Sequence, residues 1–325
     1  MRPSLLLPAL VVALACAGGP GQDSGSASDD PDAAWSRAFA TATRAHRSHR
    51  MGDLVVAETQ YERALAAAEG FPADDPRTLE TRTALARLHH KQGRYRQAVA
   101  ELAVLVPDQE RVNGAGSQPL QVTLLSLCGA RIDAGRADEG RRTCQRLLGL
   151  QDVDPATAAE ARTATILELA RAERRLRRFD DAEARYRAVL DDAAGRPRSA
   201  AWGALTVRAH TGLGLTLADQ RRFGNAESEQ LKALSILVRR RAWRSPEYPT
   251  VLRDLGDLHV ATRRYDEARE RYDRALEHFR ENLGAQHFEV RDTLLRIADL
   301  LVSTGQPREA AELRYTAEAI PDPRT

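Results

Sequence analysis

The sequence predicts an all-α fold, an α-solenoid built from about seven helical hairpins. The first observation is a set of small residues that recur every 41 to 44 positions, namely Ala57, Ala98, Gly140, Ala182, Ala226, Ala268 and Ala310. A fixed period of this size is typical of one supersecondary unit that is repeated and stacked. The second observation is composition. Charged residues make up 29% of the chain and aromatic residues only 5%, which favours amphipathic helices.

The first residues of the chain have the pattern of a targeting signal. Arg2 supplies a positive charge, and the apolar run at residues 5–15 is too short to span a bilayer but suits a signal peptide. Ala15 directly before Cys16 resembles the lipobox of bacterial lipoproteins, although Ala13 stands where that motif usually has leucine. The resemblance implies a signal peptide at residues 1–15 and a lipid on Cys16. The alternative is an ordinary cleaved signal peptide that contains a cysteine.

Residues 16–33 are predicted to tether the folded part of the chain to a membrane. After Cys16 the segment is rich in glycine, serine and aspartate and offers little apolar surface to bury. Two or more acyl chains on Cys16 would make the anchoring stable. Ala17 stands where lipoproteins that are retained at an inner membrane often have aspartate. We therefore expect a lipid anchor in the outer membrane of the cell envelope, on its periplasmic face, rather than in the inner membrane.

Within each repeat the residues predict two antiparallel helices. Small residues on both helices let the two axes approach to about 8–10 Å. In four repeats a glycine lies five residues before the periodic small residue (Ala57, Ala98, Gly140 or Ala310). This glycine is expected to end the first helix by adopting the left-handed conformation. Asp75–Pro76 and Asp154–Pro155 mark helix starts, because each places an N-cap acid before a first-turn proline. The small residues of the first helices are Ala45, Ala86, Cys128, Ala170, Gly214, Gly256 and Ala298. At the turn stand Gly52, Gly93, Gly135, Arg177, Arg221, Arg263 and Gly305, followed two residues later by Leu54, Tyr95, Ala137, Phe179, Phe223, Tyr265 and Pro307.

This order of small, turn, bulky and alanine positions resembles the tetratricopeptide repeat. Residues 251–279, VLRDLGDLHVATRRYDEARERYDRALEHF, are the best copy. The period is longer than usual and falls in the range of HEAT and armadillo repeats, but the aromatic and alanine positions favour the tetratricopeptide assignment. It is similar to the kinesin-light-chain type, whose linker reads Gly-x-x-His-Pro-x-Val. Residues 284–290 match that string except that Phe288 replaces the proline. The resemblance implies a right-handed superhelix at residues 34–320 with polar terminal repeats, and a tail at residues 321–325.

Cys128 and Cys144 lie at equal distances from the turn of the third hairpin, at inward positions of the motif. Residues placed in this way on two antiparallel helices lie at the same height, so the pattern predicts a disulfide. The alternative is a pair of buried free thiols that fill small-residue positions. An even pair of cysteines, once Cys16 is set aside, suits an oxidising compartment.

The sequence gives little support to the hypotheses of an enzymatic function or a metal site. His46 with His49, and His89 with His90, have no third ligand at a fixed spacing, so no metal site is predicted. The chain has no glycine-rich phosphate loop and no nucleophile elbow, and we predict neither catalytic residues nor a cofactor. Arginine runs without interleaved aromatic residues, at a net charge of +2, argue against nucleic acid as a partner.

Charged residues are predicted to line the concave groove of the superhelix. In tetratricopeptide arrays the residue after each small position of the first helix faces this groove, which here gives His46, Arg87, Gly129, Arg171, Leu215, Asp257 and Asp299. Lys91, Arg174 and Arg175 add basic charge on the same helices. The groove is therefore expected to be basic in its N-terminal half and acidic in its C-terminal half, a polarity that would orient a peptide. The alternative is ordinary surface charge.

One departure from the family weakens the peptide hypothesis. Peptide-binding arrays often carry asparagine two residues before the small position, where it binds the backbone of the ligand. This chain has no asparagine there, but instead Thr43, Ala84, Ser126, Glu168, Gly212, Asp254 and Arg296.

The expected function is protein–protein interaction with an unidentified protein or peptide partner. The chain is expected to act as a membrane-tethered scaffold or assembly factor of the bacterial cell envelope. The competing hypothesis is a periplasmic sensor or carrier that binds a glycan, a peptidoglycan fragment or a small molecule in the groove.

Overall fold

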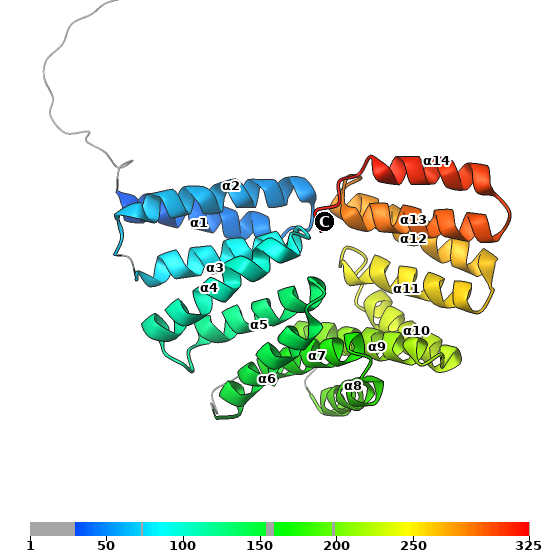
Figure 1. Ribbon diagram of the computed structural model, residues 1–325, viewed down its shortest axis with the longest axis horizontal. Helices are drawn as coiled ribbons and strands as arrows, with labels where there is room; N and C mark the ends of the chain where they lie inside the picture. The colour runs from blue at the N-terminus through cyan, green and yellow to red at the C-terminus, as the bar shows by residue number, and fades with distance from the viewer. Residues whose placement is uncertain (1–29, 73, 154–158, 197–198, 325) are drawn as a thin grey trace, which may run out of the picture.

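The computed structural model describes residues 30–72, 74–153, 159–196 and 199–324, and within these ranges every regular element is a helix (Figure 1). The elements are α1 (Pro31–His46), α2 (Met51–Ala67), the short 3-10 helix η1 (Ala68–Gly70), α3 (Pro76–Lys91), α4 (Tyr95–Asn113), α5 (Gln118–Asp133), α6 (Ala137–Val153), α7 (Ala159–Arg175), α8 (Phe179–Ala194), α9 (Ala200–Asp219), α10 (Phe223–Arg239), α11 (Glu247–Ala261), α12 (Tyr265–Leu283), α13 (Phe288–Ser303) and α14 (Pro307–Glu318). None of the described helices is both long enough and apolar enough to span a bilayer.

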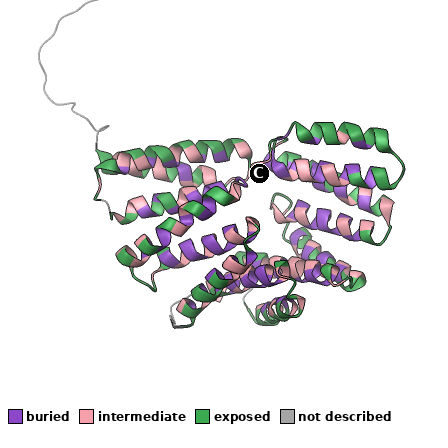
Figure 2. Ribbon diagram, viewed as in Figure 1, coloured by how far each residue is buried: buried purple, intermediate pink, exposed green. Residues whose placement is uncertain are grey.

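Consecutive helices pair as seven antiparallel hairpins, and each hairpin packs against the next, so the predicted α-solenoid is confirmed. The stack curves, with first helices such as α5 and α11 on the inner side and second helices such as α8 and α14 on the outer side (Figure 1). Buried residues follow the contacts between hairpins, while the outer faces of α2 and α14 at the two ends are exposed (Figure 2).

The repeated small residues are the points of closest helix contact. Those of the second helices are almost fully buried, with exposed fractions of 0–1% at Ala57, Ala98, Ala182, Ala226, Ala268 and Ala310. From the second repeat onward each second helix begins at the residue that the repeat marks as bulky, which gives Tyr95, Ala137, Phe179, Phe223, Tyr265 and Pro307 as first residues. The period in the sequence therefore fixes the start of six of the seven second helices.

The turns between paired helices use the left-handed conformation with and without glycine. Three predicted turn glycines adopt it, at φ of 79–85°, namely Gly93, Gly135 and Gly305. The equivalent arginines adopt it as well, at φ of 60–62°, namely Arg177, Arg221 and Arg263. In both sets the next N–H donates to the carbonyl five residues earlier, for example Arg264 to His259 at 2.8 Å. This closure of the helix end holds an L-residue in a conformation that usually favours glycine.

The first hairpin departs from the predicted pattern. Gly52 does not form the turn, because α1 ends at His46 and Gly52 lies in the first turn of α2. The carbonyl oxygens of His46 and Ser48 instead accept hydrogen bonds from Lys91 Nζ at 2.9 and 2.8 Å. A lysine from the next hairpin thus satisfies carbonyls at the end of α1, and no glycine is needed there.

Helix α1 begins three residues before the predicted start of the solenoid. Its first residue is Pro31, and the side chain of Asp30 accepts a hydrogen bond from the backbone N–H of Asp32 at 3.1 Å. The predicted cap at Asp75 is confirmed, since its side chain accepts from the N–H of Arg77 at 2.8 Å. The signal peptide, Cys16 and the Asp154–Pro155 cap lie outside the described residues.

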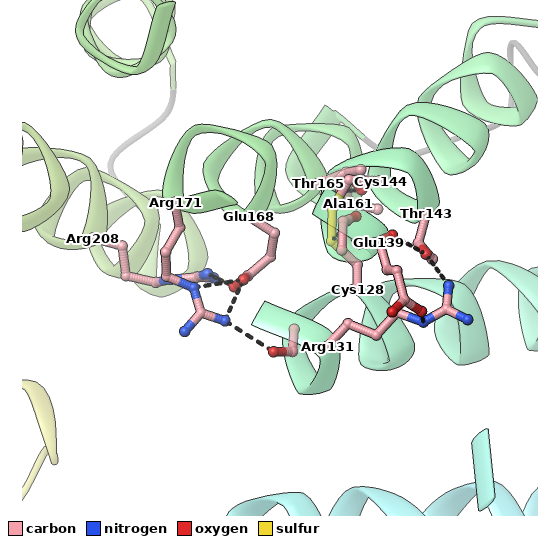
Figure 3. Close-up of a disulfide and its surroundings, with 12 residues drawn as sticks. Cys128, Arg131, Glu139, Thr143, Cys144, Ala161, Thr165, Glu168, Arg171 and Arg208 are labelled. Atoms are coloured by element: carbon pink, nitrogen blue, oxygen red, sulfur yellow. Dashed lines mark hydrogen bonds and ion pairs between the residues drawn. A yellow bond between two sulfur atoms is a disulfide. The ribbon is translucent and has the colours of Figure 1, made fainter. Parts of the chain in front are cut away.

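A disulfide joins Cys128 of α5 to Cys144 of α6 inside the third hairpin (Figure 3). The two Cα atoms lie 5.6 Å apart, and both cysteines are fully buried. They pack with Ile132, Leu169 and Ala172, so the bond lies where the third hairpin meets α7. The covalent link therefore stands close to the middle of the stack.

Replacing Gly256 by alanine should lower the free energy of unfolding by roughly 1–3 kcal/mol, because the helix contact leaves no room for a methyl group. A Cβ at Gly256 would lie 2.5 Å from Cε1 of Tyr272, a side chain that is itself buried. Chemical denaturation followed by circular dichroism measures the change. Gly149 of α6 is the matched control, since nothing lies within 4 Å of its would-be Cβ. Gly149→Ala should stabilise by about 0.5–1 kcal/mol, and equal effects of the two variants would contradict the packing argument.

Candidate functional site

A hollow of about 740 Å³ lies at the N-terminal end of the stack, among α1 to α5. We call it the N-terminal hollow. Its lining includes Phe39, Thr43, His46, Arg47, Tyr61, Glu80, Thr83, Ala84, Arg87, Lys91, Gln109, Asn113 and Gln118. Three of the predicted groove residues, His46, Arg87 and Lys91, are thus brought together.

The cations of the N-terminal hollow have no carboxylate partner among the described residues. Arg47 and Arg87 are exposed and form no ion pair there, and Lys91 donates only to backbone carbonyls. Burial and then the charge of Arg87 lower the pKa of Lys91 to about 8, so it is mostly protonated at pH 7. The only lining carboxylate is Glu80. Three cations, Arg47, Arg87 and Lys91, face one carboxylate, so the hollow carries a net positive charge.

His46 is a neutral member of this site. Its Nδ1 lies 3.2 Å from the hydroxyl oxygen of Tyr61, and the two rings meet edge to face. Burial, followed by the charges of Lys91 and Arg87, lowers the pKa of His46 to about 4. The imidazole is therefore uncharged at pH 7, and it contributes hydrogen bonding rather than positive charge.

Amide side chains form a polar wall beside the cations. Gln109 of α4 is almost fully buried and donates from Nε2 to the Thr83 hydroxyl at 3.3 Å. Asn113 donates to Oε1 of Gln109 at 2.6 Å. Phe39 and Tyr61 supply an aromatic surface, with ring centroids 5.8 Å apart. The hollow thus combines positive charge, amides and aromatic surface.

A second hollow, of about 260 Å³, lies between α7, α8, α9 and α11 and holds Arg171, Arg174 and Arg208. We call it the central hollow. All three arginines are paired there. Arg171 binds Glu168 at 2.6 Å, and Arg208 binds Glu168 at 2.5 Å (Figure 3). Arg171 also binds Asp133 at 2.6 Å. Arg174 binds Asp219 at 2.9 Å.

The pairing in the central hollow neutralises its charge. Burial by itself would raise the pKa of Asp133, but Arg171 and His90 beside it bring the value down to about 2. The pKa of Glu168 is likewise lowered, because Arg171 and Arg208 outweigh its burial. Both carboxylates are therefore ionised at pH 7 and balance the guanidinium groups around them.

Leu215 also lines the central hollow, whereas the remaining predicted groove residues lie outside both hollows, namely Gly129, Arg175, Asp257 and Asp299. Arg175 is exposed and lines neither one. Asp257 accepts hydrogen bonds from Tyr272 Oη at 2.6 Å and from Arg296 at 3.0 Å. Asp299 pairs with Arg314 at 2.8 Å. Asp257 and Asp299, the predicted acidic residues of the C-terminal half, are thus paired with arginines. Of the two hollows, only the N-terminal hollow holds basic side chains without carboxylate partners in the described structure.

Sequence reasoning missed Arg47, Tyr61, Gln109 and Asn113 as members of the site. One signal could have indicated its place. Peptide-binding arrays often have asparagine two residues before the small position of the first helix. In the first two repeats this position is Thr43 and Ala84, and both residues line the N-terminal hollow. The amides of Gln109 and Asn113 instead come from α4, the second helix of its hairpin. The sequence analysis expected only residues of first helices to face the groove.

The paired histidines bind carboxylates of neighbouring helices. His89 Nδ1 lies 2.7 Å from Glu101 and its Nε2 lies 3.4 Å from Glu58, while His90 Nε2 lies 2.9 Å from Asp133. In the part of the chain that the structure describes, no three histidine, cysteine or acidic side chains gather in a way that would hold a metal ion.

Two family models match the chain, and both describe the tetratricopeptide repeat. One matches residues 38–103 and 247–320, and the other matches residues 167–246. Neither indicates an enzyme. A search of curated protein sequences found no match.

Solved structures with the same architecture cover most of the chain. A tetratricopeptide repeat protein from Parabacteroides merdae is 14% identical, with a TM-score of 0.55 over 88% of this chain and 93% of that one. Kinesin light chain repeats from Podosopora anserina are 18% identical, with a TM-score of 0.52 over 64% and 98%. NprR in complex with its cognate peptide NprX is 10% identical, with a TM-score of 0.65 over 88% and 77%. At these identities the likeness shows a shared fold.

Proposed function

Because this chain belongs to the tetratricopeptide repeat family, we propose that it is a membrane-tethered interaction scaffold of the bacterial cell envelope. In this proposal it binds an acidic segment of a partner protein in the N-terminal hollow. Two structural neighbours are complexes, NprR with its cognate peptide NprX and a Rap protein with competence and sporulation factor. The NprR complex supports a peptide as the ligand class.

The unbalanced charge of the N-terminal hollow is the observation that carries this proposal. Both hollows contain three basic side chains, but only those of the N-terminal hollow lack carboxylate partners in the described structure. Cations that no internal carboxylate neutralises attract an anionic ligand and speed its capture. A partner segment that carries glutamate or aspartate would supply the missing charge.

The shape of the hollow favours an extended segment. Its lining follows α3 from Pro76 to Lys91, the full length of that helix. Sixteen helical residues span about 24 Å, which about seven residues of extended chain would cover. Glu80 lies toward the N-terminal end of α3, and Arg87 and Lys91 toward its C-terminal end. The acidic part of the segment is therefore placed at the Arg87–Lys91 end.

Exchanging Arg47 and Arg87 together for glutamate should weaken binding of an acidic peptide at least tenfold, about 1.4 kcal/mol. The probe is a fluorescein-labelled heptapeptide of alternating leucine and glutamate, measured by fluorescence anisotropy. The same peptide with glutamine in place of glutamate should bind the wild type as weakly as the acidic peptide binds the double variant. Arg175→Glu is the matched control, because this arginine is exposed and lies outside both hollows.

The same anisotropy assay, repeated at several pH values, should show a change in affinity of defined direction. Lys91 loses its proton as the pH rises through about 8, so affinity for the acidic heptapeptide should fall between pH 7 and pH 9. No change is expected near pH 6, since His46 is already neutral there. Unchanged affinity in the Arg47→Glu, Arg87→Glu variant would remove the N-terminal hollow from the proposal.

A second candidate function follows from the lining itself. A hollow of about 740 Å³ with aromatic rings and amide side chains falls in the size range of small-molecule sites. The chain would then act as a periplasmic sensor or carrier of a glycan, a peptidoglycan fragment or a small molecule. Thermal shift separates the two functions, because muropeptides should raise the melting temperature only of a sensor.

The membrane part of the proposal depends on Cys16 and its flanking residues. If Cys16 carries the lipid, Cys16→Ala should move the protein from the membrane fraction to the soluble fraction, and mass spectrometry should find no acyl chains. The outer membrane is the proposed location, and density-gradient separation of the two membranes tests it. Recovery of wild-type protein in the soluble fraction would contradict the anchor.

A further inference from the structure

The two ends of the superhelix touch each other. The α3–α4 turn at Gly93 lies against Phe288, the first residue of α13, and against Pro323 near the C-terminus (Figure 1). A methyl group built on Gly93 would lie 2.9 Å from Pro323 Cγ and 3.1 Å from Phe288 Cε1. The second hairpin thus meets the seventh, although four hairpins, α5 to α12, lie between them along the chain.

The C-terminal residues are fixed to α13 by ion pairs. Arg324 donates from its two terminal nitrogens to the carboxylate oxygens of Asp292, at 2.6 and 2.8 Å. Arg291 donates to Asp322 at 3.0 Å. The guanidinium of Arg324 also lies over the ring of Phe288, 5.1 Å from its centroid. These contacts hold Pro323 beside Phe288 and give the two residues one apolar surface that faces Gly93.

The neighbouring side chains are buried where the ends meet. His287 and Phe288 are only 5% and 6% exposed. Burial raises the pKa of Tyr95, the residue that follows the Gly93 turn, and the charges of Asp133 and Glu289 raise it further. Glu289 belongs to α13 and Tyr95 to α4, so this effect also reaches across the contact between the two ends.

We propose that the Gly93 turn, Phe288 and Pro323 form a latch that closes the superhelix into a ring and fixes the width of its inner side. In a solenoid each repeat contacts only its neighbours, so small rotations between repeats add up along the stack. A contact between the second and the seventh hairpin removes this freedom. The latch also explains why Phe288 replaces the proline of the related linkers, since the aromatic ring of Phe288 reaches Gly93 and lies under Arg324, whereas the pyrrolidine ring of proline is held against its own backbone and has no aromatic face.

Small-angle X-ray scattering of the full-length chain tests the latch. The wild-type profile should match the closed form, and two variants should shift to a larger radius of gyration without loss of helix signal in circular dichroism. The first variant is Phe288→Pro. Helix α13 begins at this residue and His287 before it is extended, with φ −83° and ψ 142°, so proline fits both the helix start and the preceding residue.

The second variant is Arg324→Ala, which releases the tail from Asp292. Its matched control is Arg264→Ala, because Arg264 makes an equivalent two-nitrogen contact with Glu227, at 3.0 and 2.7 Å, away from the contact between the ends. The control should keep the wild-type radius of gyration.

Two results would overturn the latch. One is a wild-type profile that is already more extended than the closed form. The other is an unchanged radius of gyration in Arg324→Ala and in a chain that ends at Ile320. The proposed function does not depend on this outcome, since heptapeptide affinity is measured separately and involves Arg47 and Arg87 rather than the latch residues.

Discussion

Replacing Asp254 by asparagine should raise the free energy of unfolding at pH 8 by roughly 2–4 kcal/mol. Asp254 lies on α11, is 8% exposed, and its Oδ2 has no hydrogen-bond partner in the described structure. Burial raises its pKa to about 7, against the opposing effect of Arg253 and with a further contribution from Asp257. Asparagine keeps the shape of the side chain and removes the charge that burial disfavours.

The sign of the pH dependence follows from the raised pKa. Between the ordinary value of 3.8 and about 7, the folded state keeps the proton on Asp254 while the unfolded state has lost it. The wild type therefore loses stability as the pH rises through this window, and the loss levels off above pH 7. The gain from Asp254→Asn should be small at pH 4 and largest at pH 8. Urea denaturation at both pH values measures it.

Asp257→Asn is the matched control on the same helix. Asp257 is about 40% exposed and is bound by Arg296 and Tyr272, so its charge is stabilised rather than penalised. This variant should lower stability or leave it unchanged at pH 8. A gain from Asp257→Asn equal to that from Asp254→Asn, or a pH-independent gain at Asp254, would show that burial of the Asp254 charge is not the cause.

Removing the Cys128–Cys144 disulfide should lower the free energy of unfolding by about 3 kcal/mol, the value expected for a loop of this size. The two cysteines are 16 positions apart in the sequence. Alanine suits Cys128, because the equivalent positions of the neighbouring repeats are Ala86 and Ala170, both fully buried. Cys144 is also replaced by alanine, although the equivalent positions there are the larger Leu102 and Tyr186. Chemical denaturation of the double variant against the wild type gives the difference.

Intact mass settles the state of the two thiols in the protein as isolated. Alkylation of the unfolded chain without reductant should add no mass at Cys128 or Cys144, and alkylation after reduction should modify both. Cys16→Ala provides the control for a cysteine outside the pair and should leave the free energy of unfolding unchanged. Labelling of both residues without reductant would support the alternative of two buried free thiols.

Most of the fold could be predicted from the sequence because helical hairpins are local structures. The spacing of small residues marked the helix contacts, and the bulky positions marked the starts of the second helices from Tyr95 onward. The prediction was wrong at Gly52, where Lys91 of the next hairpin satisfies the carbonyls of the first turn. That contact joins different repeats, and a pattern within one repeat does not contain it.

The candidate site was predicted only in part, because some of its contacts also join different repeats. The position after each small residue of the first helix, with Lys91 on the same helix, predicted that His46, Arg87 and Lys91 share one face. The structure brings these three residues together. The same position also placed Arg171 and Asp299 in the groove, where the structure pairs each of them with an opposite charge. The Arg171–Asp133 pair spans two hairpins, and sequence analysis gave no means of matching individual charges between repeats.

The sequence by itself determined the repeating unit, the number of hairpins and the small residues at which helices meet, since each depends on residues within one period. Only the tertiary structure decided which charges remain unpaired, that Asp254 is buried, and that Gly93 meets Phe288 and Pro323. The physical reason is the range of the interactions involved. Helix formation and hairpin packing are fixed by neighbours along the chain, whereas charge balance and ring closure depend on the accumulated curvature of all seven hairpins.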